Sequence, residues 1–494
     1  MSSHSVQTVK NGLKVLSGQI GINIFSLAFG IYFAHVLALR EMAILAILVL
    51  ISGLLSVTAS LGMNDTLVKK IPAFIEEGKL HEVKSYFSAI LFVQMVVATL
   101  LVCLTLSFYK EISILFYKSI LPFSTMAIIL SYAYVRGLLL IMDAMIRGVQ
   151  RFGRLSTARV VEQVSSRLMS IALFFVWHVN GLLLGMLVGS IVCFLLYCYF
   201  LKEFIEFSKP SIKKMKEIIS YSFPYYGAAW LRFSIMQSDR YFVSIFFQPD
   251  QLAVYHVATK IIEYFIQFID ALSAPITSKI AQLKVYGKER MESIFVKTIK
   301  YYFLLYIPVI GLLIAFARPA IELYGGAKYS NGFLIMIILA VGLMLAPFSS
   351  LIEAFIFILG EPLERLKIRF LSGVFSIIGT YELMKMLSVN GLALSKLFVW
   401  GIYIVVGAVL LRKFIVVRID IKTLFKTIGL CLPIVAIGIV IQFFMYSYLT
   451  VALYFLIFIS IVGFFYINVL KSDRGLLEVL TTKRFRGIAF LNKL

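Results

Sequence analysis

The stretch VNGLLLGMLVGSIVCFLLYCYFLKEF (179–204) aligns without a gap on VNGLALSKLFVWGIYIVVGAVLLRKF (389–414), which lies 210 positions further along the chain. Three more correspondences occur at this shift: Asp143 falls on Glu353, Arg159 on Arg369, and LREMAIL (39–45) on PDQLAVY (249–255). A single match can arise by chance, but a constant offset along a chain indicates an internal repeat. The sequence therefore predicts two copies of one structural unit.

The composition places both copies in a membrane. Of the 494 residues, 61% are hydrophobic and only 15% are charged, and the mean hydropathy is +0.95. A soluble protein of this length carries far more charge on its surface, so most of this chain has hydrocarbon as its solvent. The four cysteines all fall in apolar stretches, which favours small buried side chains over a disulfide, a zinc site or a nucleophile.

Apolar runs of about 20 residues, the length that crosses a hydrocarbon core of about 30 Å, recur fourteen times. They lie at 15–38, 42–62, 86–108, 122–146, 157–177, 181–201, 223–247, 251–276, 299–317, 333–358, 370–387, 391–411, 424–446 and 449–469. Lipid satisfies no backbone hydrogen bonds, and the runs lack the alternation of barrel strands, so each is expected to be a helix. The predicted fold is an all-α polytopic membrane protein of about fourteen transmembrane helices.

The repeat divides these helices into two lobes of six, at residues 1–208 and 209–416, followed by residues 417–494 with two further helices and a basic tail. Because six is even, both lobes have the same topology, and the axis relating them is expected to lie along the membrane normal. This arrangement leaves a cleft between the lobes. The segments 209–219 and 278–300 are expected to form amphipathic helices at the membrane interface.

Basic residues in the short loops predict the orientation. Six lie within spans, and six lie in loops that would be external: Arg40, Lys110, Lys118, Arg318, Lys328 and Lys385. The remaining 35 of the 47 basic residues fall in segments that would be cytoplasmic. This bias predicts that both termini are cytoplasmic. The same bias explains the net charge of +22, which we interpret as a surface that faces anionic lipid rather than as a nucleic-acid site.

The sequence lacks the usual signs of catalysis. It has no GxxxxGK[ST] loop for ATP phosphates, and its five histidines show no metal-ligand spacing, so we expect no cofactor and no metal. A membrane glycosyltransferase or polymerase would need a large external loop for its catalytic residues, whereas every expected external loop has about fourteen residues or fewer. We therefore expect a protein that is not an enzyme, and whose work draws on an ion gradient or on the substrate's own gradient.

Charged residues at mid-depth in the spans are the candidate site, because an ionisable group at the membrane centre costs roughly 2.5 to 3.5 kcal/mol and usually faces a cavity or a partner. The basic ones are Arg136, Arg167, Arg232, Arg240 and Lys260, and the acidic ones are Glu162, Asp239, Glu263 and Asp270. Four others are expected nearer the surfaces: Asp143 and Glu353 on the cytoplasmic side, Glu382 and Lys396 on the outer side.

The seventh and eighth helices carry most of this charge. Arg232 and Asp239 lie on one face of the seventh helix, with Arg240 one step around. The eighth helix carries one polar stripe, made of Lys260, Glu263, Gln267 and Asp270. Adjacent residues point about 100° apart on a helix, so Asp239 and Arg240 each need a partner from elsewhere, such as this stripe, a substrate or water.

The equivalent positions in the first lobe carry no charge. The residues 210 positions before Arg232, Asp239, Arg240, Lys260, Glu263 and Asp270 are Ile22, Phe29, Gly30, Leu50, Gly53 and Ser60. A purely structural network would be expected in both lobes, so a functional role is favoured for the cluster, with structural pairing as the alternative. Arg167 and Arg136 are the first lobe's candidates, and for them the two roles are equally open.

Four stretches resemble the polysaccharide transporter (oligosaccharide flippase) family of the multidrug/oligosaccharidyl-lipid/polysaccharide exporter superfamily. They are LSGQIGINIFSLAFGIYFAHVLALREMAILAI (16–47), LLSVTASLGMNDTLVKKIP (54–72), MIRGVQRFGRLSTARVVEQ (145–163) and SDRYFVSIFFQPDQLAVYHVATKI (238–261). The first external turn, ALREMA, lacks the family's usual acidic or glycine residue, and the second turn reads FQPDQLAVY. The plan of fourteen helices agrees with the resemblance.

The resemblance implies translocation of a polyprenyl-phosphate- or polyprenyl-diphosphate-linked oligosaccharide from the cytoplasmic to the outer leaflet. It implies alternating access coupled to H⁺ or Na⁺, with membrane lipids and polysaccharide-assembly proteins as further candidate partners and no nucleic acid. The phosphates would bind Arg232, Arg240, Arg167, Arg136 and Lys260, with Asp239 orienting Arg240, while Glu263, Asp270 and Asp239 would couple the ion. Pro224 and Gly227 are the candidate hinge, and the last two helices resemble a pair that could form a groove for the lipid tail.

Two other functions stay open. A drug or cation antiporter of the same fold would use Glu263, Asp270 and Asp239 as its binding acids and the arginines as structural groups. A non-transporting assembly factor would use all the buried charges for packing.

Overall fold

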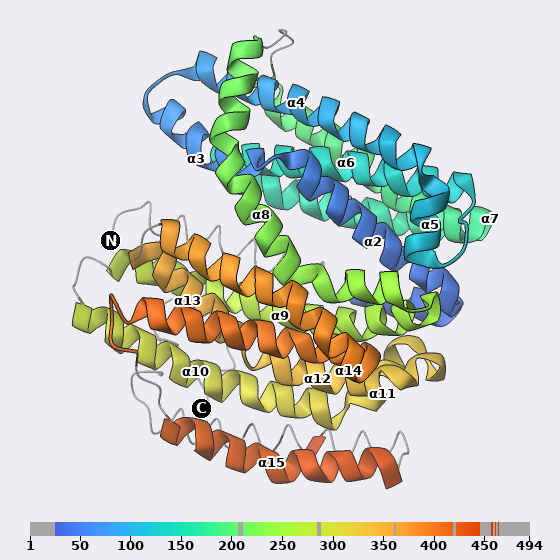
Figure 1. The fold of residues 1–494 in the computed structure, drawn as a ribbon, viewed down its shortest axis with the longest axis vertical. Helices are drawn as coiled ribbons and strands as arrows, with labels where there is room; N and C mark the ends of the chain where they lie inside the picture. The colour runs from blue at the N-terminus through green and yellow to red at the C-terminus, as the bar shows by residue number, and fades with distance from the viewer. Residues whose placement is uncertain are drawn as a thin grey trace, which may run out of the picture. The chain divides into compact units, whose positions relative to one another are not determined.

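In the computed structural model the described residues, 25–205, 211–283, 288–359, 362–417, 421–444 and four single positions beyond, form helices and no strand. After a helix at Phe25–Val36 come α2 (Leu39–Ser60), α3 (Met63–Glu76), α4 (Leu80–Ser107), α5 (Tyr109–Tyr117), α6 (Phe123–Gly148) and α7 (Phe152–Leu201). Next come α8 (Ile212–Phe246), α9 (Pro249–Leu283), α10 (Lys288–Ala315), α11 (Ala317–Gly325) and the short 3₁₀ helix η2 (Ala327–Gly332). The last are α12 (Phe333–Leu343), α13 (Ala346–Leu359), α14 (Pro362–Leu411) and α15 (Ile421–Phe444) (Figure 1).

Eight helical stretches within the described ranges are long and apolar enough to cross a membrane. This confirms an all-α, multi-pass membrane fold. The last predicted span, 449–469, lies almost wholly outside the described residues, and the orientation of the termini stays a prediction.

The longest two helices, α7 and α14, each double back on themselves. Helical geometry is interrupted at His178 (φ 50°) in α7 and at Ser388 (φ 56°) in α14. The halves of α7 then run alongside each other, because the Ser170 hydroxyl donates to the Leu182 carbonyl at 2.9 Å. Each is therefore a helical hairpin, with its break in the gap predicted between two spans.

The helix order repeats at the offset found in the sequence. The bounds of α14 lie 210 positions after those of α7, and α12 begins 210 positions after α6. The two breaks, His178 and Ser388, are also 210 positions apart. We refer to the described residues 25–205 as the first repeat and 211–417 as the second repeat.

The division into residues 1–208, 209–416 and 417–494 stays a prediction. By its contacts the chain forms two compact units, one of Met1–Gln282 with Ile321–Phe414, the other of Leu283–Ala320 with Ile415–Leu494. Within the second unit α10 packs on α15. The cross-repeat contacts described below all lie within the first unit.

Several local predictions were wrong. Residues 212–219 form no separate interfacial helix but continue into α8, and α10 begins at Lys288 and also runs on without a break. The expected span 333–358 is largely confirmed, because α12 and α13 together belong to one candidate membrane span, Ala327–Ile356, with a turn at residues 344–345. Short helices, α5 and α11, occupy loops that hydropathy alone does not resolve into helices.

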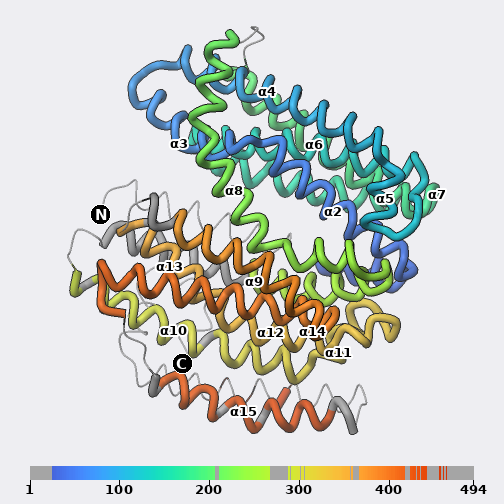
Figure 2. The backbone as a smooth tube through the Cα atoms, viewed as in Figure 1, coloured from blue at the N-terminus to red at the C-terminus, as the bar shows by residue number. Residues whose placement is uncertain are grey.

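Helix α8 connects the two repeats. It packs against α14 in its own repeat and against α2 and α3 in the first (Figure 2). Gly62, with φ +76°, permits a close approach, because a Cβ atom there would lie 2.4 Å from the backbone nitrogen of Tyr226. The Thr66 and Ser222 hydroxyls add a buried hydrogen bond of 2.8 Å. Side chains at the middle of α8 are therefore held between the repeats.

Candidate functional site

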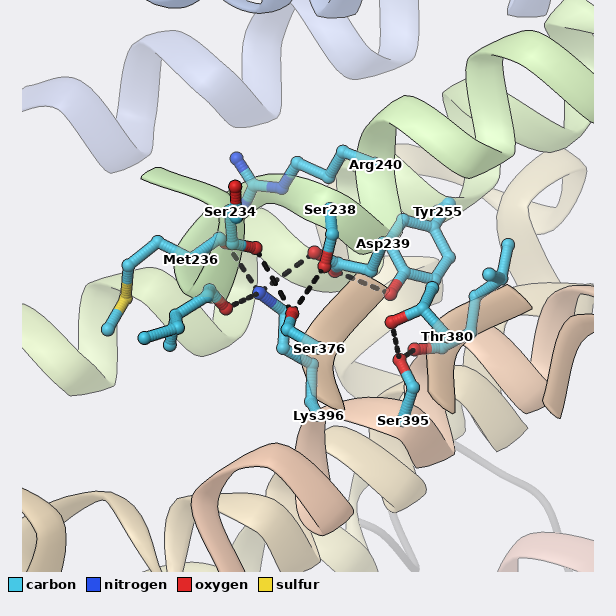
Figure 3. A network of polar contacts seen from close by, with 12 residues as sticks. Ser234, Met236, Ser238, Asp239, Arg240, Tyr255, Ser376, Thr380, Ser395 and Lys396 are labelled. Carbon is cyan, nitrogen blue, oxygen red and sulfur yellow. Dashed lines mark hydrogen bonds and ion pairs between the residues drawn. The ribbon is translucent and has the colours of Figure 1, made fainter. Parts of the chain in front are cut away.

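Asp239 is the most deeply buried of the predicted site residues, with 1% of its surface exposed. Its Oδ1 lies 2.8 Å from Nζ of Lys396 on α14, and its Oδ2 accepts a hydrogen bond of 2.7 Å from the Tyr255 hydroxyl on α9. Figure 3 shows these three side chains converging while Arg240 points elsewhere. Both oxygens of Asp239 therefore face partners other than Arg240, on which Asp239 acts electrostatically, so its role in orienting Arg240 stays a prediction.

Lys396 was expected near the outer surface, and its pairing with Asp239 was missed. Its ammonium also donates to the Met236 carbonyl at 2.5 Å. Beside it, the hydroxyls of Ser238 and Ser376 join α8 to α14 at 2.8 Å (Figure 3). This part of the cluster is a neutral, hydrogen-bonded connection within the second repeat.

Arg240 takes its partner from the polar stripe on α9, which was one of the alternatives that the sequence left open. Its guanidinium is buried and forms an ion pair with Oε1 of Glu263, while Oε2 of Glu263 lies 2.7 Å from Nζ of Lys260. Lys260 and Glu263 are three residues apart, so they share one face of the helix. Two cations thus surround one carboxylate, which leaves the group with a net charge of +1.

Arg136 has its own counter-ion in the first repeat. Its Nη1 lies 2.5 Å from Oε1 of Glu162, between α6 and α7. Glu162 is buried, whereas the arginine side chain is 37% exposed. The pair is neutral, which favours a structural role for Arg136.

Arg167, in contrast, forms no ion pair with any described carboxylate. Its guanidinium carbon lies 4.4 Å from the ring centroid of Phe29, and its Nε is buried without a hydrogen-bond partner. Tyr264 on α9 and Tyr324 on α11 interact with it electrostatically. The Tyr264 hydroxyl donates to the Ser26 carbonyl at 3.1 Å, which brings the second repeat against the first helix. Glu162 also acts on it electrostatically, so Arg167 is a cation that lies among aromatic residues of both repeats without an ion pair to any described carboxylate.

The close packing around Arg167 depends on a small residue next to Phe29. A Cβ atom at Gly30 would lie 2.2 Å from the Tyr324 hydroxyl oxygen and 3.4 Å from that of Tyr264. The sequence showed Arg167 as one candidate among several. Neither tyrosine was predicted, because no spacing rule relates α9 and α11 to the first repeat.

The remaining predicted residues are more dispersed. Arg232 is exposed on α8 and makes no hydrogen bond or ion pair with a described residue, and the Asp270 side chain lies outside the described part of the chain. Pro224 and Gly227 line an apolar groove of about 830 Å³ between α8 and α14. Because α8 is helical throughout Ile212–Phe246, their role as a hinge stays a prediction.

The described charges leave the candidate site positive. Glu162, Asp239 and Glu263 each face a cation, and nearer the surface Asp143 pairs with Arg159 and Glu353 with Arg369. Arg167, Arg232 and one positive charge of the Arg240–Lys260–Glu263 group are left without a described counter-ion. A site of this polarity favours an anionic ligand, since an unbalanced charge in a poorly solvated place is costly.

Fold and charge together define an all-α, multi-pass membrane protein with a cationic candidate site. The chain belongs to the family described as polysaccharide biosynthesis protein, whose sequence profile matches residues 8–281. A search of curated proteins gives no match.

Solved structures share the fold at low sequence identity. The lipid II flippase MurJ, in an inward closed conformation, is similar with a TM-score of 0.76 and 16% identity, covering 93% of this chain and 99% of that one. A multidrug resistance MATE family transporter of the MOP superfamily, inward-facing, has a TM-score of 0.65 and 17% identity over 82% and 96% of the two chains. A MOP superfamily transporter from Pyrococcus furiosus, described as having a binding pocket of reverse polarity, has a TM-score of 0.58 and 16% identity over 82% and 94% of the two chains. The predicted family and fold are confirmed.

Proposed function

We propose that this protein is a flippase that moves a polyprenyl-phosphate- or polyprenyl-diphosphate-linked oligosaccharide from the cytoplasmic to the outer leaflet. Arg167 is the observation that carries the proposal, because its half-buried side chain has a buried Nε without a hydrogen-bond partner and forms no ion pair with a described carboxylate. The membership of a polysaccharide biosynthesis family and the fold shared with a lipid II flippase support it.

The residues around Arg167 suit the head of such a substrate. A guanidinium can donate two parallel hydrogen bonds to one phosphate, and such charge-assisted bonds are about twice as strong as neutral ones. Tyr264 and Tyr324 add hydroxyl groups that can donate to or accept from sugar hydroxyls. Arg167 binds the phosphate in this proposal, and the tyrosines contact the first sugar.

The lipid tail needs an apolar route that stays open to the bilayer. The groove between α8 and α14 is lined by apolar side chains, among them Phe223, Leu231 and Phe370, and Lys367 is the one charged residue among the described lining residues. Because lipid tails are as apolar as a polyprenyl chain, the chain binds to such a surface in preference to lipid only where it packs more closely against the groove. We assign the tail to this groove rather than to the last two helices.

The Arg240–Lys260–Glu263 group offers a way to couple transport to H⁺ or Na⁺. Glu263 pairs with both Arg240 and Lys260 and neutralises one of the two positive charges. A phosphate that binds Arg240 would compete with Glu263 for the guanidinium, and the released carboxylate would then be free to take up a proton or sodium. Asp239 is less suited to this role because Lys396 and Tyr255 hold both its oxygens, and Asp270 stays a second candidate.

The test measures translocation of a fluorescent polyprenyl-diphosphate oligosaccharide in proteoliposomes, with efflux of a cationic dye in parallel. Arg167→Ala should reduce lipid translocation at least tenfold, on the basis of a loss of about 2 kcal/mol or more for a charge-assisted contact in a poorly solvated site. Arg167→Lys should retain part of the activity because it keeps the charge without the planar fork.

The matched control is the double variant Arg136→Ala/Glu162→Ala, which removes a neutral pair from the same repeat. It should retain translocation wherever it accumulates in the membrane. Full translocation by Arg167→Ala would refute the flippase site, and gradient-driven efflux of the dye by the parent protein would favour the cation antiporter.

A further inference from the structure

Two lysines join the repeats at one end of the helices, and neither belongs to the candidate site. Lys118, directly after α5, donates to the carbonyl of Ile245 near the end of α8. Lys328, in η2, donates to the carbonyl of His35 at 2.9 Å and to that of Leu37 at 2.6 Å. The first bond runs from the first repeat to the second, and the other two run in the opposite direction.

The two contacts are equivalent under the repeat. Lys328 stands 210 positions after Lys118, and Ile245 stands 210 positions after His35. Lys118 and Lys328 occupy equivalent positions, and so do their acceptors, Ile245 and His35. The two contacts are therefore the same contact made once in each direction between the repeats. Sequence reasoning assigned both lysines only to external loops, because the exchange becomes visible only when the helix ends are placed in space.

The acceptors explain why a lysine is suited to each position. The last carbonyls of a helix have no partner within the helix and carry a partial negative charge. His35 and Ile245 lie in the final turns of Phe25–Val36 and α8. Burial lowers the pKa of the Lys118 ammonium, so its charged form depends on such acceptors for compensation.

A third contact at this end also joins equivalent positions. Arg40 at the start of α2 and Asp250 at the start of α9, again 210 residues apart, approach to 4.0 Å. Their side chains are 75% and 50% exposed, so this pair contributes little by itself. Its position agrees with a symmetric contact surface between the repeats.

We propose that Lys118 and Lys328 form a two-part latch that holds the repeats together at this end, and that both must release their carbonyls before this end can open. The latch is a conformational device that goes beyond the proposed function. It rests on that function in one respect, namely that the transporter alternates between two states. A contact can shift such an equilibrium only if it differs between the states, and these bonds cannot survive separation of the repeats. Because the bonds are equivalent, loss of one leaves the other to hold the closed state.

The experiment measures the distance between spin labels at Lys110→Cys on α5 and Leu323→Cys on α11, in full-length protein in lipid nanodiscs with the four native cysteines replaced. Both labelled positions are exposed. Lys118→Met/Lys328→Met should raise the population with long distances by about tenfold or more, since bonds to charged groups are among the stronger ones. Lys118→Met alone and Lys328→Met alone should each raise this population by less than half as much as the double variant does.

The matched control is Lys385→Met. This lysine pairs at 3.4 Å with Glu382 on its own helix, so its loss removes the same charge but no contact between the repeats. The control should leave the distances unchanged. Unchanged distances in the double latch variant would overturn the proposal.

A second measurement remains decisive if the double variant does not fold. Lys118→Cys and Ile245→Cys are bridged by a short bifunctional methanethiosulfonate, which replaces the lysine contact by a reversible covalent one. The bridged protein should lose translocation and regain it on reduction, whereas normal translocation with the bridge in place would refute the latch. The label distances need no substrate, so they test the latch even if the proposed flippase function fails.

Discussion

Replacing Lys396 by methionine tests whether the buried Asp239–Lys396 pair is structural. The substitution keeps the length of the side chain but leaves Asp239, 1% exposed, with Tyr255 as its remaining described partner. Removal of one member of a buried ion pair typically costs 3–5 kcal/mol, because the other charge is left uncompensated. We expect a loss of about this size for Lys396→Met, given the burial of the carboxylate.

The double variant Asp239→Asn/Lys396→Met should recover most of the loss. It buries no charge, and replacement of a whole buried pair is often neutral. The two single effects and the double effect should therefore differ from additivity by about 2 kcal/mol or more. The variant Asp239→Ala/Arg240→Ala is the matched control, and it should recover nothing because it leaves Lys396 without its carboxylate and Glu263 with Lys260 as its remaining described cation.

The assay is the folded fraction in membranes and after extraction, followed by thermal unfolding in lipid–detergent micelles. Translocation is measured on whatever folded protein remains. Parental stability in Lys396→Met, or recovery in Asp239→Ala/Arg240→Ala, would refute the assignment of partners. A folded Asp239→Asn/Lys396→Met variant that no longer translocates would show that the pair also serves transport.

Three further predictions concern the hairpins, the coupling group and the orientation. A Cβ atom at Gly181 would lie 2.0 Å from the Leu173 carbonyl oxygen, and one at Gly391 would lie 1.9 Å from the Leu383 carbonyl oxygen. Alanine at either position should therefore lower membrane abundance by several-fold. Alanine at Gly153, which has open space around it, should not. Glu263→Gln should bind substrate but lose the response of translocation to an ion gradient, and a full response in this variant and in Asp270→Asn would exclude both as coupling groups. A reporter fused after Leu494 should be cytoplasmic, and an external signal would contradict the orientation inferred from the basic loops.

Repetition and hydropathy were sufficient to predict the membrane fold and the breaks in the long helices. The expected gaps between spans, 177–181 and 387–391, contain His178 and Ser388, where the helical geometry is interrupted. The polar stripe on α9 likewise predicted a partner for Arg240, because periodicity shows which side chains share a face. Both the helix breaks and the polar stripe depend on residues close together in the chain, and the spacing of residues in the sequence is enough to predict them.

Contacts between distant helices were not predictable in this way. The pairings Asp239–Lys396 and Arg136–Glu162 depend on the depth and rotation of each helix against its neighbour. Hydropathy places a residue along a helix to within about a turn and does not define its rotation against another helix, which packing sets. For the same reason Arg167 could not be distinguished from Arg136, although one has a counter-ion and the other has none in the described structure.

The two repeats differ in a way that separates movement from recognition. Contacts that would govern opening are duplicated, since Lys118 and Lys328 exchange equivalent acceptors and the hairpins break at equivalent positions. Charged groups of the candidate site are not duplicated, because Phe29 occupies the position equivalent to Asp239 and packs against Arg167. Symmetric contacts let two similar halves move by the same geometry, whereas an elongated ligand with a phosphate at one place and sugars at another needs different partners from each half. In the proposed function, the asymmetric charges would therefore serve to bind the substrate, and the symmetric lysine contacts would serve the conformational change.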